Sequence, residues 1–316
     1  MNRRDFLALT AGAALAGQTN CSQTPAPIPI IDTHVHLFDP TRPQGVPWPP
    51  PTNTVLYKPA LPERLRAIAE PLGVVGAIKV EASPWIEDNQ WVLNVAEKDP
   101  FMVGVVGFLE LGKPEFGEQL DRFRKHPLFL GIRYGLLWGR NLAEEYGSPV
   151  FLANLKLLAN AGMSLDTANQ SLPLLDAVVR ITDHVPELRV IIDHLPQFEP
   201  PAADAGRQTY LSTLRELAGR KHVYVKVSEV FRRVDGHIPE DLDFYRPRLD
   251  EIWEIFGEDQ LLFGSDWPNS DNWKPYPQVL NLVREYVTEK GRTVSEKFFW
   301  RNAAAAYRFP SRDRLG

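Results

Sequence analysis

The chain has 316 residues but only one cysteine, Cys21. A single thiol cannot form a disulfide within the chain. Zinc sites built from four cysteines, or from two cysteines and two histidines, are excluded by the same count. Any metal bound by this protein must therefore be held by histidine, aspartate, glutamate or lysine side chains.

A surplus of basic residues is missing as well. The 35 lysines and arginines are outnumbered by 40 aspartates and glutamates, which leaves a formal net charge of -5. Proteins that wrap nucleic acid need a net basic field, so nucleic acid is not an expected partner. The 44% hydrophobic and 24% charged residues are typical of a globular protein with a full core. We expect a small molecule as the partner, and the sequence does not specify an oligomeric state.

The apolar run near the amino terminus is too short to cross a membrane. It extends from Ala8 to Gly17 and covers ten residues, whereas a bilayer needs about twenty. Arg3 and Arg4 precede the run, and Ala14-Leu15-Ala16 offers a small-residue cleavage site. This combination is typical of twin-arginine export signals.

These features predict an export signal and linker over residues 1–24 and a single domain over residues 25–316. The expected location is the periplasm. Lipid anchoring at Cys21 is not expected, because Gln18-Thr19-Asn20 is not the small apolar lead that such a site requires.

A Gly-x-Gly-x-x-Gly turn is missing after the first apolar strand, which disfavours an open dinucleotide-binding sheet. What is present is a repeated alternation of short apolar, β-branched runs with stretches of helical spacing. The eight runs are candidate buried strands: Ile28 to His36, Val74 to Ala82, Met102 to Glu110, Phe129 to Tyr134, Met163 to Thr167, Leu188 to Leu195, Val223 to Ser228 and Leu261 to Trp267. Eight strand and helix units in this length predict a (β/α)₈ TIM barrel.

An ionisable side chain lies near the carboxyl end of each predicted strand. These residues are His34, Glu81, Glu110, Arg133, Asp166, His194, Lys226 and Asp266. Barrel enzymes build their active sites at that face, so the set predicts a catalytic pocket. For Glu110 and Asp166, a helix-capping or packing role is an equal alternative.

The first strand, Ile30 to His36, carries the most specific segment. Residues two apart on a strand project to the same side, so His34 and His36 are expected to direct two imidazoles to one point. Asp32 is expected to share that face one step deeper and to hold a histidine tautomer.

The motifs together resemble a known family. They are His34-Val35-His36, Gly131-Ile132-Arg133, Asp193-His194, Lys226-Val227-Ser228 and Gly264-Ser265-Asp266-Trp267-Pro268. In this order and spacing they are similar to the amidohydrolase-related family 2 enzymes of the amidohydrolase superfamily. Within these enzymes, the chain most resembles the lactonase-like group of sugar-lactone and pyrone-dicarboxylate lactonases.

The resemblance implies a metal site of His34, His36, His194 and Asp266 that holds a divalent ion, zinc or manganese. It also allows catalysis without metal, because some lactonases of the group work metal-free. Asp266 and His194 are the expected catalytic residues, with Asp266 as the general base for water.

Three further residues are expected to bind substrate: Arg133, Lys226 and Glu81. For Arg133 and Lys226, a buried salt bridge to Glu110 or Glu81 is the alternative. Trp48, Trp85, Trp138 and Trp267 flank strand ends and either form an apolar or sugar-stacking wall or serve as ordinary packing.

The chain departs from the pattern of its relatives at three positions. Asp166 ends the fifth strand where decarboxylase relatives have a metal-binding histidine. Glu229 follows Ser228 where the lactonases usually have glycine, and Glu81 stands where a neutral amide is common.

The expected function is hydrolysis of a lactone or related carboxylic ester, with a sugar-derived ring as one candidate. The alternative within the family is a metal-dependent non-oxidative decarboxylase, which Asp166 disfavours. A barrel retained as a binding protein is the third and least favoured hypothesis, because the acid, base and cationic positions are intact.

Overall fold

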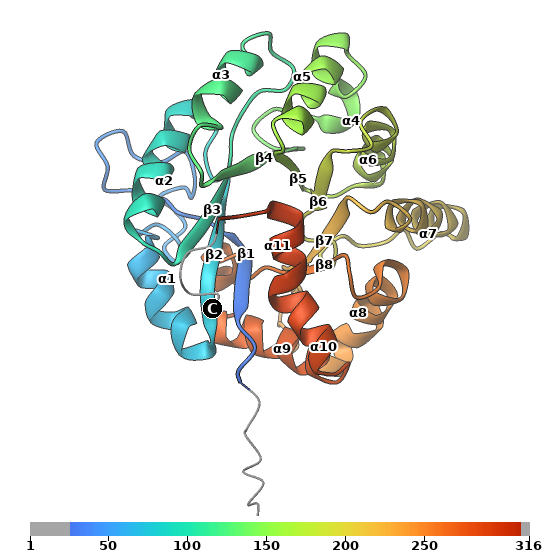
Figure 1. Ribbon diagram of the computed structural model, residues 1–316. Helices are drawn as coiled ribbons and strands as arrows, with labels where there is room; N and C mark the ends of the chain where they lie inside the picture. The colour runs from blue at the N-terminus through green and yellow to red at the C-terminus, as the bar shows by residue number, and fades with distance from the viewer. Residues whose placement is uncertain (1–25, 311–316) are drawn as a thin grey trace, which may run out of the picture.

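Eight parallel strands form the centre of the computed structural model, which describes residues 26–310 (Figure 1). Each strand pairs with the next one along the chain. Their bounds are β1 Ile30–Val35, β2 Val74–Val80, β3 Met102–Gly107, β4 Phe129–Gly135, β5 Ser164–Ala168, β6 Arg189–Ile192, β7 Val223–Val227 and β8 Leu261–Phe263.

The sheet closes between its first and last strands. Val35 forms a parallel bridge with Trp267, and the amide of Asp266 donates to the carbonyl of His34 over 2.8 Å. The predicted TIM barrel is thus confirmed, with every predicted strand present. The predicted runs extend past several strand ends because their last residues, including His36 and Asp266, lie in the loops that follow.

Helices lie between successive strands and cover the outside of the barrel (Figure 1). The α-helices are α1 Pro62–Ala69, α2 Ile86–Lys98, α3 Phe116–Phe123, α4 Leu142–Glu145, α5 Pro149–Asn160, α6 Leu172–His184, α7 Asp204–Ala218, α8 Leu242–Phe256, α9 Tyr276–Thr288, α10 Arg292–Glu296 and α11 Asn302–Tyr307. The other helical segments are the 3₁₀ turns η1 Glu70–Leu72 and η2 Asn269–Asn272 and the π-helical segment η3 Lys297–Arg301.

Local sequence explains where several helices begin. Ser148 and Ser171 precede α5 and α6, and each side chain accepts a hydrogen bond from an amide of the first turn. Proline occupies the first or second helical position in both, where the missing N–H has no partner to lose. The strands are buried along almost their whole length, as expected for a parallel sheet covered by helices.

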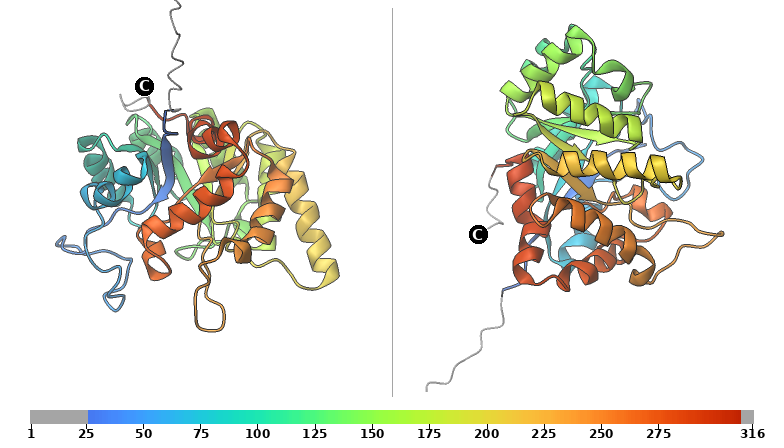
Figure 2. Two further views of the ribbon diagram at one scale, coloured as in Figure 1. Left: turned by 90° about the horizontal axis from the view of Figure 1, so that it is seen from below. Right: turned by 90° about the vertical axis from the view of Figure 1, so that its right-hand side faces the viewer.

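The last helix closes one end of the barrel. Ala303, Ala306 and Tyr307 of α11 pack against apolar strand residues that include Ile31 and Leu262. In the left view of Figure 2, this helix lies at the end opposite to the long loops after β1 and β7. The carboxyl ends of the strands and the loops that follow them therefore form the open end.

The predicted export signal, with Arg3, Arg4 and Cys21, lies outside the described residues, so the periplasmic location stays a prediction. Within residues 26–310, no helix is both long enough and apolar enough to cross a membrane.

Candidate active site

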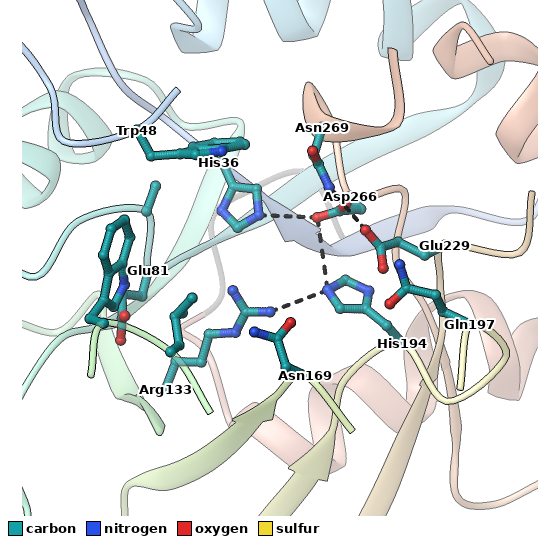
Figure 3. Close-up of a pocket in the computed structure, with 13 residues that line it drawn as sticks. His36, Trp48, Glu81, Arg133, Asn169, His194, Gln197, Glu229, Asp266 and Asn269 are labelled. Atoms are coloured by element: carbon teal, nitrogen blue, oxygen red, sulfur yellow. Dashed lines mark hydrogen bonds and ion pairs between the residues drawn. The ribbon is translucent and has the colours of Figure 1, made fainter. Parts of the chain in front are cut away.

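A pocket with a volume of about 310 Å³ lies at the carboxyl ends of the strands (Figure 3). Residues from loops after seven of the eight strands contribute to its walls. The lining residues are His36, Trp48, Glu81, Ala82, Arg133, Leu137, Trp138, Asn169, His194, Gln197, Glu229, Asp266 and Asn269.

Three imidazoles converge on one carboxylate oxygen at the floor of this pocket. Asp266 Oδ1 lies 3.0 Å from His36 Nε2, 3.4 Å from His34 Nε2 and 3.9 Å from His194 Nε2. All four side chains are buried. The first-strand pair, the sixth-strand histidine and the eighth-strand aspartate, far apart in sequence, therefore meet as predicted.

The hydrogen bonds of His36 identify which of its nitrogens carries a proton. Its Nδ1 lies 3.0 Å from the carbonyl oxygen of Val80, which can only accept, so Nδ1 is the donor. In a neutral ring, Nε2 then has a bare lone pair that faces Asp266 Oδ1. Two acceptors face each other across 3.0 Å, an arrangement that a cation between them stabilises.

Burial keeps the imidazoles of His34 and His194 neutral. Burial lowers the pKa of His194 to about 4, against the opposing effect of Asp266 and Asp193. Burial also lowers the pKa of His34 well below its usual value. His34 Nε2 is buried without a hydrogen-bond partner among the described residues, although it points toward Asp266. Neutral imidazole is the form that binds metal.

Asp266 is ionised. Burial alone would raise the pKa of its carboxyl group, but at the acidic pH where this group titrates the positive charge of the protonated imidazoles, His194 first, outweighs burial and lowers that pKa. The other oxygen, Oδ2, accepts a hydrogen bond from the Asn269 amide over 2.7 Å. The same amide nitrogen donates to Glu229 Oε1 over 2.9 Å, so Asn269 links the two carboxyl groups. Burial and then the negative charge of Asp266 raise the pKa of Glu229 well above its usual range.

A row of buried charges lies under the pocket floor. Asp193 is its centre, because its carboxylate lies 2.9 Å from Lys226 Nζ, 3.0 Å from Arg133 Nε and 3.6 Å from His34 Nδ1. Lys226 also donates to Asp166 over 2.7 Å. These contacts fix the orientation of Arg133, whose terminal nitrogen lies 3.2 Å from His194 Nε2.

Unusual backbone conformations are concentrated at this pocket. Of the seven described non-glycine residues with positive φ, five line it: Trp138, Asn169, His194, Glu229 and Asp266. Each such residue costs about 1 kcal/mol or more, which neighbouring packing must offset. Position 264 needs glycine for a different reason, because a Cβ there would lie only 2.8 Å from the His34 side chain. The strand ends are therefore shaped for the side chains that they direct into the pocket.

Two of the three predicted substrate-binding residues line the pocket, and the third does not. Arg133 and Glu81 line the pocket, and Glu81 is held by Arg140 over 2.7 Å. Lys226 does not line it, because its ammonium group is fully buried between Asp166 and Asp193. The salt-bridge alternative thus describes Lys226 better, with partners other than the predicted Glu81 and Glu110.

Asp32 is a correction to the sequence-based prediction. A register irregularity between Asp32 and Val35 interrupts the simple alternation of β1. The Asp32 carboxylate accepts hydrogen bonds from the Ser265 amide and from the hydroxyl of Tyr276, which belongs to α9. It therefore joins β1 to the end of β8 and orients no histidine ring.

Two of the four tryptophans predicted near strand ends line the pocket, and two do not. Trp48 and Trp138 line the pocket, and the Trp48 ring lies edge-on to His36 with centroids 5.4 Å apart. Trp267 is completely buried, and Trp85 is 38% exposed outside the pocket.

Sequence reasoning did not identify three amides of the pocket: Asn169, Gln197 and Asn269. Each lies three residues after an ionisable residue at a predicted strand end (Asp166, His194 and Asp266), which is the only sequence signal that could have found them. Glu229 was noticed only as a departure from relatives, and its contact with Asn269 places it in the site.

The donor set fits a divalent metal ion. Among the described residues, His34, His36 and Asp266 offer ligand atoms within 4.8 Å of one another, and so do His194, Glu229 and Asp266. The unpartnered His34 Nε2 and the lone pair of His36 that faces Asp266 are the features that a cation would satisfy.

Comparison with known proteins agrees with the geometry. The chain is 29% identical over 244 residues to L-fucono-1,5-lactonase from Burkholderia ambifaria, a match that covers 76% of this chain and 80% of that relative. Its fold is similar to that of an amidohydrolase from Burkholderia multivorans crystallised with bound zinc. That structure has a TM-score of 0.78 and 23% identity, with 89% of this chain and 99% of that chain covered.

More distant barrels show the same fold. Dihydroxybenzoic acid decarboxylase from Polaromonas sp. JS666, with bound manganese, has a TM-score of 0.59 and 14% identity and covers 89% of this chain and 96% of that chain. The family model for amidohydrolases matches residues 31–309, nearly all of the described barrel. The chain therefore belongs to the amidohydrolase family and is a hydrolase.

Proposed function

We propose that this protein hydrolyses a lactone whose ring carries several hydroxyl groups, such as a sugar lactone. The observation that carries the proposal is the position of ionised Asp266 at the pocket floor, with three imidazoles around it and the Arg133 guanidinium at its edge. The similarity to a lactonase that acts on L-fucono-1,5-lactone supports it.

Lactone hydrolysis needs a base for the attacking water and a cationic or donor group for the carbonyl oxygen. Asp266 accepts the proton of the water, and Asn269 holds its carboxylate in the orientation for this transfer. The same carboxyl group then returns the proton to the leaving alkoxide as the ring opens. Arg133 donates to the carbonyl oxygen as negative charge develops there, because Asp193 fixes its guanidinium at the pocket edge.

His34, His36, His194 and Asp266 would hold a divalent cation. When bound, such a cation lowers the pKa of water and polarises the carbonyl.

The pocket walls suit a hydroxylated ring. The amides of Asn169, Gln197 and Asn269 offer both donors and acceptors, as sugar hydroxyls require. Trp48 and Trp138 provide aromatic surface for the less polar faces of the ring. Arg140 neutralises Glu81, so the part of the wall that Glu81 forms carries little net charge. It therefore does not favour a carboxylate group on the substrate.

A panel of sugar lactones, aromatic lactones and simple esters, assayed by proton release before and after chelation, tests the proposal. We expect turnover of hydroxylated lactones, with slower turnover of simple esters. Turnover of no lactone would refute the proposal. Release of carbon dioxide from a carboxylated ring would instead support the decarboxylase alternative, for which Asp166 offers no accessible ligand because Lys226 and Tyr307 hold it.

We further propose that the protein acts in the periplasm after twin-arginine export. The Arg3-Arg4 pair and the short apolar run after it support this location. Fractionation of cells that express the full chain, compared with an Arg3→Lys, Arg4→Lys double variant, tests it. We expect the variant to remain in the cytoplasm, and equal distribution of both forms would contradict the proposal.

A further inference from the structure

Glu229 lies two residues after the end of β7 and lines the pocket beside Asp266. Its backbone has a φ of 49°, close to the values of 51° at His194 and 62° at Asp266. These three residues follow the ends of β6, β7 and β8, which are neighbours in the sheet. The chain thus uses the same left-handed turn three times in succession to direct a side chain to the pocket floor.

The ligand atoms of these three residues lie within 4.8 Å of one another. Asn269 donates to both carboxyl groups through one amide nitrogen, which holds Glu229 and Asp266 side by side. Two adjacent carboxyl groups repel each other in a partly buried site when both are ionised, and a divalent cation removes that repulsion.

A second observation points to a cation independently of the carboxylates. His34 is completely buried, and its Nε2 has no hydrogen-bond partner within the described part of the chain, yet it lies 3.4 Å from Asp266 Oδ1. This unpartnered nitrogen, together with Nε2 of His36, is directed at the carboxylate that Glu229 adjoins.

The fifth strand contributes no ligand to this centre. Its charged residue, Asp166, is completely buried and accepts hydrogen bonds from Lys226 and Tyr307 beneath the floor. Any further oxygen ligand must therefore come from another loop, and Glu229 is the carboxylate in position to supply it.

We propose that Glu229 is a ligand of the divalent cation held by His194 and Asp266. This inference rests on the proposed presence of a cation at the site, and it adds a ligand from the loop after β7. A second carboxylate makes the ligand set harder, which favours manganese over a set of imidazoles alone.

The test is Mn²⁺ binding by the full chain, freed of metal with a chelator that is then removed by dialysis. Free Mn²⁺ is followed by its electron paramagnetic resonance signal, which does not depend on enzymatic activity. We expect Glu229→Gln and Glu229→Gly to weaken Mn²⁺ binding by about tenfold or more.

Two features of the design separate ligation from folding. Glycine adopts a positive φ without strain, so Glu229→Gly should not destabilise the metal-free protein, which thermal unfolding in chelator checks. Asp235→Asn is the matched control, because Asp235 lies in the same loop with a φ of 48° but is exposed. Its Mn²⁺ affinity should equal that of the wild type.

Unchanged Mn²⁺ affinity in both Glu229 variants would overturn the assignment, and so would a wild-type protein that binds no Mn²⁺. Lactone hydrolysis is measured separately. A protein that hydrolyses lactones with equal Mn²⁺ affinity in all variants would contradict only the role of Glu229, whereas metal binding without lactone turnover would contradict only the proposed function.

Discussion

Lys226 Nζ lies 2.9 Å from Asp193 Oδ1, and both side chains are fully buried. The same ammonium group contacts Asp166, so one lysine forms ion pairs with two carboxylates below the pocket. Its role in this structure is to hold the floor of the active site in place.

Replacement of Lys226 by methionine should therefore reduce stability strongly. Removal of one partner from a buried ion pair leaves uncompensated charge, which costs about 3–5 kcal/mol. Urea unfolding measures this loss in the free energy of unfolding. The control is Lys221→Met, since Lys221 is exposed just before the same strand and should change stability little. Equal stability of the two variants would show that Asp166 and Asp193 do not depend on Lys226.

Replacement of Asp266 by asparagine should remove catalysis with little change in fold. An amide cannot accept the proton of the attacking water, so kcat for lactone hydrolysis should fall by about 10²–10⁴-fold. Steady-state assays on the best lactone of the panel measure the change. Asp259→Asn provides the comparison, because that carboxylate precedes the same strand at the opposite end and is 74% exposed. Undiminished turnover in Asp266→Asn would exclude Asp266 as the base.

Chelation should lower thermal stability, and added metal should restore it. A ligand that binds only the folded state at a hundredfold above its Kd adds about 2.7 kcal/mol to the free energy of unfolding. Calorimetry with and without zinc or manganese measures the shift in Tm. We expect His36→Ala to lose this shift, while His184→Ala, at an exposed histidine at the end of α6, retains it. An equal response of both variants would place the stabilising metal elsewhere.

Lys79 should make stability depend on alkaline pH. Burial lowers its pKa from 10.5 to about 8, despite the opposing charges of Glu81 and Asp88, and Arg133 lowers it further. Between these two values the unfolded chain retains the proton that the folded protein has lost. The unfolded state then binds more protons, so the contribution of Lys79 to the free energy of unfolding rises with pH.

The measurement is urea unfolding of the wild type and Lys79→Met between about pH 7.5 and 10. The free energy of unfolding of the wild type, relative to that of the variant, should rise by up to about 1.4 kcal/mol per pH unit above pH 8. Lys98→Met, at an exposed lysine in α2, should show no such trend relative to the wild type. A constant difference between wild type and Lys79→Met would refute the lowered pKa.

The fold was predictable because buried parallel strands have a strong local signature. Runs such as Val74 to Val80 are apolar and β-branched, and helical spacing follows each of them. The convergence of His34, His36, His194 and Asp266 was predictable for the same reason, since every strand of a barrel delivers its carboxyl end to one face.

Other features depend on details that periodicity does not contain. Asp32 contacts Ser265 and Tyr276, which are far away in sequence, and no pattern of apolar residues indicates such contacts. Lys226 looked like a substrate ligand because it ends a strand, but its depth below the floor is set by the partners that surround it in space.

Loop residues were the least predictable part of the site. Glu229 and Asn269 meet only because the turns after β7 and β8 bring them together, and such loop conformations have no periodic signal. In barrels of this kind, polar residues just after a strand end are therefore candidate active-site residues.

Tyr307 in α11 donates its hydroxyl to Asp166, which accepts from Lys226, and Lys226 in turn contacts Asp193 beside Arg133. The closing helix and the catalytic groups are thus consecutive members of one chain of contacts. Tyr307 thus seals Asp166 from below, although it lies at the end of the barrel opposite to the pocket. Truncation of the chain before α11 would therefore expose the buried carboxylates beneath the catalytic groups.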